Sequence, residues 1–180
     1  MPRLARVDVA GEIYHVINRA NGRLQIFSND EDYLLFEKLM HEAKELTDMR
    51  ILAYSIMPNH WHLVVHPKSD GDLGTFMHRL TNAHTRHVHV KTGTVGSGHL
   101  YQGRYKSFLV QNESYLLTLI KYVERNPVRA RLVKKCENWR WSSAWIRVLG
   151  TAEHQKLLAK IPTELPENYA NWINTSDKVD

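Results

Sequence analysis

Apolar residues in the first 130 positions recur with two different periods. Short runs rich in β-branched and aromatic residues predict strands, whereas a spacing of about 3.6 residues predicts helices. Tyr33, Phe36 and Met40, for instance, fall on one helical face. The pattern predicts strands at 11–19, 50–57, 60–66 and 104–110, and helices at 30–48, at about 72–90 and from Asn112 or Ser114 to about Asn126, where Pro127 should interrupt the last helix.

The predicted elements occur in the order strand, helix, strand, strand, helix, strand, helix. This is the order of the ferredoxin-like split βαβ fold, an α+β architecture in which helices pack on one face of a mostly antiparallel sheet. The tryptophan-rich segment 138–149 should pack on the core. We assign residues 1–150 to one domain and residues 151–180 to a C-terminal extension that is partly helical and then frayed or disordered.

Composition and charge narrow the classes of protein to consider. The chain has 180 residues, of which 43% are hydrophobic, enough for one core, and a formal net charge of +5 that allows a polyanionic partner. Cys136 is the single cysteine, which excludes an internal disulfide and a cysteine-rich zinc site. Because no apolar run approaches the roughly 20 residues of a membrane span and the first residues lack the apolar core of a secretory signal, we expect a cytoplasmic, nucleoid-associated protein with no membrane partner.

Two histidines in the strand expected at 60–66 form the first candidate site. His60 and His62 are two residues apart, so their imidazoles should project from the same face of a strand, with Trp61 on the other. Paired imidazoles are a natural half-site for a divalent metal, which needs a further ligand from elsewhere in the fold. An ordinary pair of half-exposed histidines is the alternative interpretation of the same pattern.

The helix expected after residue 112 carries the second candidate group. Tyr122 and Asn126 are four residues apart and therefore adjacent on one flank of the apolar stripe of this helix. A tyrosine nucleophile needs a metal to polarise the phosphate that it attacks, and an oxygen of Asn126 is a candidate third ligand beside the two imidazoles. The structural alternative is that Tyr122 is an aromatic residue at the edge of the core and Asn126 a helix terminator before proline.

Five short segments carry more information together than any one of them alone. They are Tyr-His-Val-Ile-Asn-Arg at 14–19, Met-Pro-Asn-His-Trp-His-Leu-Val at 57–64, His-Leu-Tyr-Gln-Gly-Arg-Tyr-Lys-Ser at 99–107, Tyr-Val-Glu-Arg-Asn-Pro-Val-Arg-Ala at 122–130 and Trp-Arg-Trp-Ser-Ser-Ala at 139–144. In this order they resemble the single-tyrosine HUH transposases (IS200-like), and among them the branch associated with repetitive extragenic palindromes (REP). The resemblance covers about residues 2–150 and does not extend to 151–180.

The resemblance implies that residues 1–150 are the catalytic domain of a metal-dependent, single-stranded DNA transposase. His60 and His62 match the family's metal motif, Tyr122 matches its nucleophile, and Asn126 falls where the family places a polar third ligand; family members use Mg²⁺ or Mn²⁺. The implied reaction is a transesterification at hairpin or palindromic DNA sites. It leaves a 5′-phosphotyrosine link and a free 3′-OH that can rejoin the strand without ATP.

Basic and aromatic side chains near these motifs are candidate contacts for DNA. Tyr101, Tyr105 and Trp61 are candidates for stacking on unpaired bases, with burial in the core as the alternative. A rival metal site consists of His84, His87 and His89, of which the first two share one helix face, but it lacks a nearby carboxylate. The candidates for phosphate contacts are Arg19, Arg104, Lys106, Arg125 and Arg129.

Two other functions fit the same sequence. A hairpin nucleic-acid-binding module would retain the fold without the chemistry, and a metal-dependent phosphodiesterase would use water as its nucleophile, with Tyr122 only structural. Related insertion-sequence transposases exchange the tyrosine helix between the chains of a dimer, whereas the palindrome-associated branch can act as a monomer with its tyrosine in cis. We therefore expect either a monomer or a homodimer.

Overall fold

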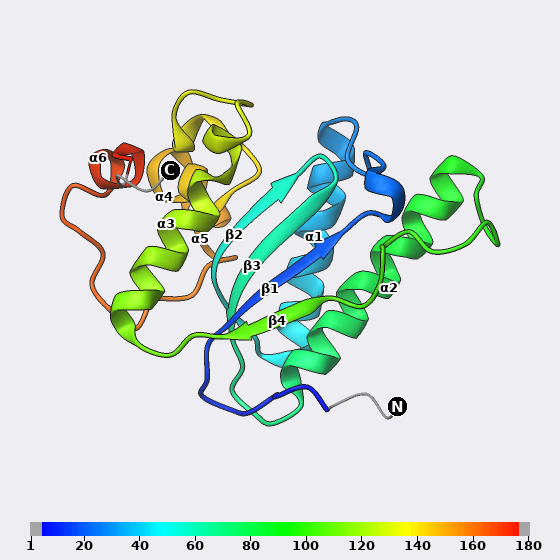
Figure 1. Ribbon diagram of the computed structural model, residues 1–180, viewed down its shortest axis with the longest axis horizontal. Helices are drawn as coiled ribbons and strands as arrows, with labels where there is room; N and C mark the ends of the chain where they lie inside the picture. The colour runs from blue at the N-terminus through cyan, green and yellow to red at the C-terminus, as the bar shows by residue number, and fades with distance from the viewer. Residues whose placement is uncertain (1–4, 177–180) are drawn as a thin grey trace.

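The computed structural model describes residues 5–176, and its centre is a four-stranded antiparallel sheet (Figure 1). The strand order is β2-β3-β1-β4, which is the α+β, ferredoxin-like arrangement that the order of elements predicts. The elements are β1 (Tyr14–Arg19), η1 (Asn21–Arg23), α1 (Asp30–Thr47), β2 (Arg50–Met57), β3 (His60–His66), α2 (Asp72–Thr92), β4 (Lys106–Leu109), α3 (Glu113–Arg129), η2 (Cys136–Asn138), α4 (Ser143–Leu149), α5 (Ala152–Gln155) and α6 (Tyr169–Asn174).

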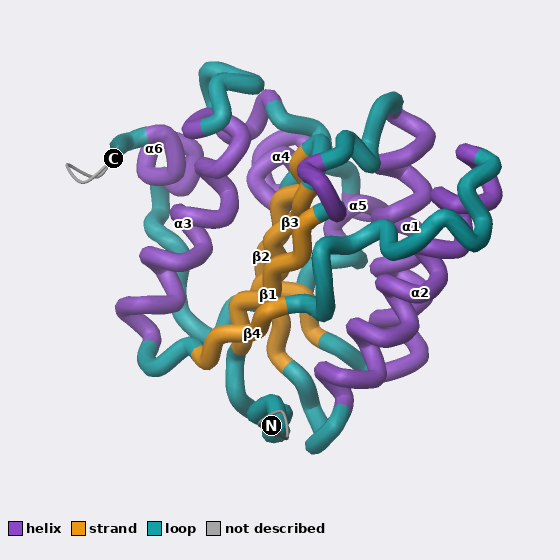
Figure 2. The backbone as a smooth tube through the Cα atoms, turned by 45° about the vertical axis from the view of Figure 1, so that its right-hand side comes forward, coloured by secondary structure: helices purple, strands orange, loops and turns teal. Residues whose placement is uncertain are grey.

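Helices cover both faces of the sheet, which corrects the prediction of helices on one face. Helices α1 and α2 pack together on one side, and α3 lies on the other side, against β2 and β3 (Figure 2). Strand β2 is consequently buried on both faces, which explains why its sequence is almost continuously apolar instead of alternating. The apolar layer between α3 and the sheet consists of Leu52, Ala53, Val64, Val110, Leu116, Leu119, Ile120, Val123 and Ile161.

The boundaries of α3 determine which side chains share its face. The side chain of Asn112 caps its start by accepting a hydrogen bond from the backbone N–H of Tyr115 at 2.9 Å. We predicted that the helix ends before Pro127, but it continues to Arg129. Pro127 lies close to the C-terminal end, and beyond it the last turn still closes through a hydrogen bond from the Ala130 N–H to the Asn126 carbonyl at 2.9 Å.

A buried carboxylate ties the back of α3 to the C-terminal part of the chain. Glu124 is fully buried and accepts hydrogen bonds from Ser143 Oγ at 2.5 Å, from Arg147 Nε at 3.1 Å and from the hydroxyl of Tyr169. These three donors compensate the cost of burying the Glu124 charge. The network therefore fixes the axial rotation of α3 and the direction in which its opposite face points.

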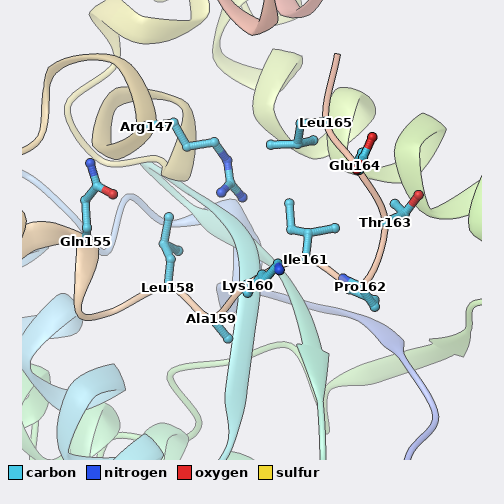
Figure 3. Close-up of a pocket in the computed structure, with 10 residues that line it drawn as sticks. All are labelled: Arg147, Gln155, Leu158, Ala159, Lys160, Ile161, Pro162, Thr163, Glu164 and Leu165. Carbon is cyan, nitrogen blue, oxygen red and sulfur yellow. The ribbon is translucent and has the colours of Figure 1, made fainter. Parts of the chain in front are cut away.

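Residues 151–176 pack on the rest of the molecule. Leu157, Ile161 and Ile173 in this segment are buried, whereas residues 177–180, where we expected fraying, lie outside the described residues. A pocket of about 860 Å³ opens beside the segment, with the guanidinium of Arg147 reaching into it (Figure 3). None of the predicted site residues lines that pocket. Within residues 5–176, every helix is too short or too polar to cross a membrane.

The Glu124 network gives the first testable prediction. Glu124→Ala should lower the free energy of unfolding by about 3–5 kcal/mol, because it leaves the Arg147 charge buried without its partner. Urea denaturation followed by circular dichroism measures this change. Glu153→Ala is the matched control, since Glu153 makes an exposed ion pair with Lys156 and its loss should leave the unfolding midpoint unchanged. Equal midpoints for Glu124→Ala and the unsubstituted protein would show that the network does not hold α3.

Candidate active site

The two histidines of β3 project from one face of the sheet, as their spacing predicts. The centroids of the His60 and His62 rings are 5.2 Å apart, and this face is the one on which α3 packs. His62 is buried, with 5% of its surface exposed, and His60 is half-buried. Trp61, between them, points into the opposite core layer. The sheet thus presents two imidazoles toward the tyrosine helix.

Helix α3 brings Tyr122 against these rings. The centroid of the Tyr122 ring lies 5.8 Å from that of His62, edge to face, and 41% of the tyrosine remains exposed to solvent. Asn126 follows one turn later on the same flank, and its buried Nδ2 atom has no hydrogen-bond partner. Since the nitrogen and oxygen of an asparagine amide exchange places by a flip, this position can also present an oxygen. An unsatisfied amide beside the nucleophile candidate is a group that a ligand would satisfy.

His15 of β1 is a third histidine in the cluster, and the sequence patterns did not single it out. Its Nε2 atom lies 3.0 Å from Nδ1 of His62, the two rings stack at 5.3 Å, and the ring of Tyr122 is 6.1 Å away. The register pairs Ile17, not His15, with His62, so His15 meets His62 as a diagonal neighbour across the two strands. Strand alternation places His15 on one face of β1, but only the register of β1 against β3 shows what it contacts.

The contacts at Nδ1 of both β3 histidines are compatible with a free lone pair on Nε2 of each ring. Nδ1 of His60 lies 2.7 Å from Oδ1 of Asn59, an acceptor, so Nδ1 carries the proton and the lone pair is on Nε2. When His62 donates its Nδ1–H to His15, its own Nε2 is likewise a free lone pair. Histidines that bind metals are oriented in this way, through a hydrogen bond from the ring nitrogen that does not bind the metal.

Burial keeps all three imidazoles neutral at neutral pH. It lowers the pKa of His15 to about 4. Burial is also the main cause that lowers the pKa of His60 to about 4, and the positive charge of Arg19 adds to this effect. The pKa of His62 falls to about 2, first because of burial and then because of its His15 and His60 neighbours. A neutral imidazole is the form that binds a metal ion.

The donor set of this cluster suits a divalent cation. It offers two neutral imidazoles, ligands that Mn²⁺ and other first-row metals accept. Within residues 5–176 there is no group of three or more His, Cys, Asp or Glu side chains arranged to hold a metal. The further donor that the sequence suggests is the amide of Asn126, which lies one turn after Tyr122 on α3.

Three of the predicted basic residues lie near the cluster. The guanidinium carbon of Arg129 is 4.7 Å from the centre of the Tyr122 ring. Arg19 is paired with His60 in the register of β1 and β3, and Lys106 of β4 is paired with Ile17. Alternation along the strands therefore places Arg19 and Lys106 on the same face as the histidines.

Two other predicted phosphate contacts are not beside the imidazoles. Arg104 lines a groove of about 700 Å³ beside α2, and it also lines a pocket of about 400 Å³ together with Lys106 and Phe108 of β4. Arg125 is buried, with 8% of its surface exposed, and donates a hydrogen bond to the backbone carbonyl of Ile173 at 3.1 Å. Arg125 therefore stabilises the packing of α3 against the C-terminal segment and is not displayed to a ligand.

The structure also corrects two of the predicted stacking residues and the rival metal site. Trp61 is fully buried and donates from Nε1 to the hydroxyl of Tyr101, itself buried, at 3.0 Å. That hydroxyl lies 2.6 Å from Nδ1 of His84, whose burial lowers its pKa to about 3. Trp61, Tyr101 and His84 thus form a hydrogen-bonded row in the core, whereas His87 is exposed on the surface of α2. These residues are structural.

Solved structures resemble this chain to different extents. A REP-associated tyrosine transposase bound to a REP hairpin matches with a TM-score of 0.69 and 19% identity, over 92% of this chain and 95% of that chain. At this identity the likeness shows a shared fold. A candidate transposase from Deinococcus radiodurans (TM-score 0.47, 18% identity, 69% of this chain and 95% of that one) and tRNA(His) guanylyltransferase from Saccharomyces cerevisiae (0.44, 12%, 86% and 80%) fall below the similarity that indicates a common fold.

The sequence comparison identifies the family. No curated protein sequence matches the chain. A family model described as "Transposase IS200 like" matches residues 8–126, a span from before β1 to Asn126 in the last part of α3. It includes His15, His60, His62, Tyr122 and Asn126. The match extends over more than half of the chain. The protein therefore belongs to the IS200-like transposase family.

Proposed function

We propose that this transposase nicks and rejoins single-stranded DNA through a 5′-phosphotyrosine intermediate on Tyr122. The observation that carries the proposal is that the exposed phenol of Tyr122, from α3, lies against His62, from β3, within a single chain. Membership of the transposase family supports DNA cleavage and strand transfer in general. The proximity of the phenol to the imidazoles supports the use of tyrosine in particular, in preference to water or to a binding module without chemistry.

The proposed reaction conserves the phosphate ester. The Tyr122 oxygen attacks the scissile phosphorus in line and loses its proton to solvent, the bond from phosphorus to the 3′ oxygen breaks, and that oxygen takes up a proton. The products are a 5′-phosphotyrosine ester and a free 3′-OH. A second 3′-OH reverses the step and joins a new end to the strand, so no ATP is consumed.

The chain's own residues would hold and orient the reactants. We propose that His60, His62 and Asn126 hold Mg²⁺ or Mn²⁺, which would polarise a non-bridging oxygen of the scissile phosphate. Asn59 and His15 would orient the two imidazoles through their Nδ1 atoms. The guanidinium of Arg129 would pack on the face of the Tyr122 ring and place a positive charge beside the phosphate.

The substrate class we propose is hairpin DNA at palindromic repeats. One structural relative is bound to a REP hairpin, and this chain has that fold over 92% of its length. The formal net charge of +5 and the exposed Arg19, Lys106 and Arg129 beside the cluster suit a polyanionic strand. Because Tyr122 and both imidazoles come from one chain, we further propose that the tyrosine acts in cis in a monomer.

Tyr122→Phe provides the test of this function. The protein is incubated with a hairpin oligonucleotide labelled at its 3′ end and Mn²⁺, then analysed on a denaturing gel, because the 5′-phosphotyrosine retains the 3′ fragment. We expect a covalent adduct that disappears in Tyr122→Phe, since phenylalanine keeps the ring but lacks the attacking oxygen. Tyr115→Phe is the matched control, because Tyr115 is a similarly exposed tyrosine two turns earlier on α3, and its substitution should leave the adduct unchanged.

The remaining outcomes of this experiment separate the other functions. Strand cleavage without an adduct would assign the nucleophile to water and make the protein a phosphodiesterase. Binding without cleavage, in both Mg²⁺ and Mn²⁺, would make it a hairpin-binding module. An adduct that persists in Tyr122→Phe would place the nucleophile elsewhere in the chain.

The imidazole contacts give a separate prediction about the metal. Asn59→Ala and His15→Phe should each weaken Mn²⁺ binding by about 10- to 100-fold, because both remove the acceptor that orients a ligand while leaving the ligand in place. Titration followed by the electron paramagnetic resonance of free Mn²⁺ measures the affinity without relying on activity. His66→Ala is the control, since His66 belongs to the same strand and face but bonds the Gly11 carbonyl. Unchanged affinity in both test variants would refute the orienting role of these contacts.

A further inference from the structure

One half of the sheet face that carries the histidines is not covered by a helix. Helix α3 packs on β2 and β3, whereas Arg19 of β1 and Lys106 and Phe108 of β4 are exposed on the same face. Phe108 has 51% of its surface exposed, an unusual state for a phenylalanine on a sheet that is otherwise well packed. This uncovered half begins directly beside the candidate active site.

Phe108 continues the row of rings that starts at the metal-site candidates. The register pairs it directly with His15, and the centroids of these two rings are 6.0 Å apart. His15 in turn stacks on His62 and lies 6.1 Å from the ring of Tyr122. Phe108 and Tyr122 thus both border the same imidazole, so a strand whose phosphate reaches Tyr122 brings its neighbouring nucleotides close to Phe108.

Positive charges flank the exposed ring. Lys106 lies two residues before Phe108 on β4 and therefore on the same face, and Arg19 and Arg129 lie on the side of the histidines. Among the described residues, none of these three cations forms an ion pair. An aromatic face bordered by unpaired cations is the combination that binds single-stranded nucleic acid, since the cations attract phosphates and the ring stacks on a base.

We propose that Phe108 is the stacking subsite for an unpaired base close to the scissile phosphate. The DNA backbone crosses β1 and β4 along Lys106, Arg19 and Arg129, and the base stacks on the solvent side of the Phe108 ring. The subsite accepts any base, because every base has a π face and the structure shows no hydrogen-bonding pattern at Phe108 that would read one. This inference rests on the proposed function, whose DNA strand it positions.

The experiment measures base-dependent binding in the Tyr122→Phe protein, which cannot form the adduct. The two probes are fluorescein-labelled dT12 and a 12-mer of abasic spacers with the same phosphates, titrated by fluorescence anisotropy. Phe108→Ala should weaken dT12 binding by about 5- to 10-fold and leave the abasic probe unaffected, because only the bases stack. Phe108→Trp should retain or improve dT12 binding, and Phe108→Leu should behave like Phe108→Ala.

The matched control is Leu109→Ala. Leu109 is the next residue of β4, is 42% exposed and points to the opposite face, so its removal should leave both affinities unchanged. The subsite is refuted if Phe108→Ala binds dT12 as tightly as its parent, if both probes lose affinity equally, or if the parent does not bind dT12. A change in sedimentation in Phe108→Ala without loss of dT12 affinity would instead make this face a contact between two copies of the chain.

The subsite and the proposed function fail in different ways. If the adduct forms on Tyr122 but dT12 affinity does not depend on Phe108, the subsite is refuted and the proposed function is not. Base-dependent binding through Phe108 without any adduct would refute the function and leave a single-strand binding surface.

Discussion

The contact between α3 and the β2–β3 half of the sheet determines the rest of this molecule. It is an apolar contact, in which the stripe of α3 that includes Leu116, Ile120 and Val123 covers side chains of β2 and β3. This packing forces β2 to be buried on both faces, and it decides which flank of α3 faces the histidines. The nucleophile candidate and the imidazoles meet because a hydrophobic surface, remote from any chemistry, aligns the two elements that carry them.

The polar chemistry of the site is arranged around this apolar support. Burial makes His62 neutral, and His15 gives its second nitrogen a hydrogen-bond partner, so a ring that is almost inaccessible still has one lone pair to offer. The exposure changes from β3 to β4: His62 is buried, whereas Phe108 is half exposed. One face of the sheet therefore combines a desolvated imidazole cluster beside α3 with an open aromatic surface on β4.

Local sequence patterns identify the parts of the site but not their neighbours. Strand alternation was sufficient to place His60 and His62 on one face, and helical spacing was sufficient to place Tyr122 beside Asn126. His15 could not be found in this way, because its role depends on the register between β1 and β3, strands that are separated by more than 40 residues. The same holds for Phe108, whose exposure depends on which part of the sheet α3 leaves uncovered.

Burial was the other property that the sequence could not supply. Arg125 follows the nucleophile candidate in a basic segment, but the C-terminal segment covers it and accepts its hydrogen bond. Trp61 and Tyr101 have the residue types of a base-stacking surface, and the long α2 helix encloses them in the core. The order of secondary-structure elements predicted the ferredoxin-like sheet, whereas the position of α3 on the opposite face depended on tertiary packing alone.

The uninterrupted course of α3 through Pro127 has a mechanical consequence. Helix α3 carries Tyr122, Asn126 and Arg129 on successive turns. On its other side, Glu124 binds Ser143 and Arg147 through hydrogen bonds. A tilt of α3 would therefore shift the backbone positions of Tyr122, Asn126 and Arg129 together, because one continuous helix carries all three.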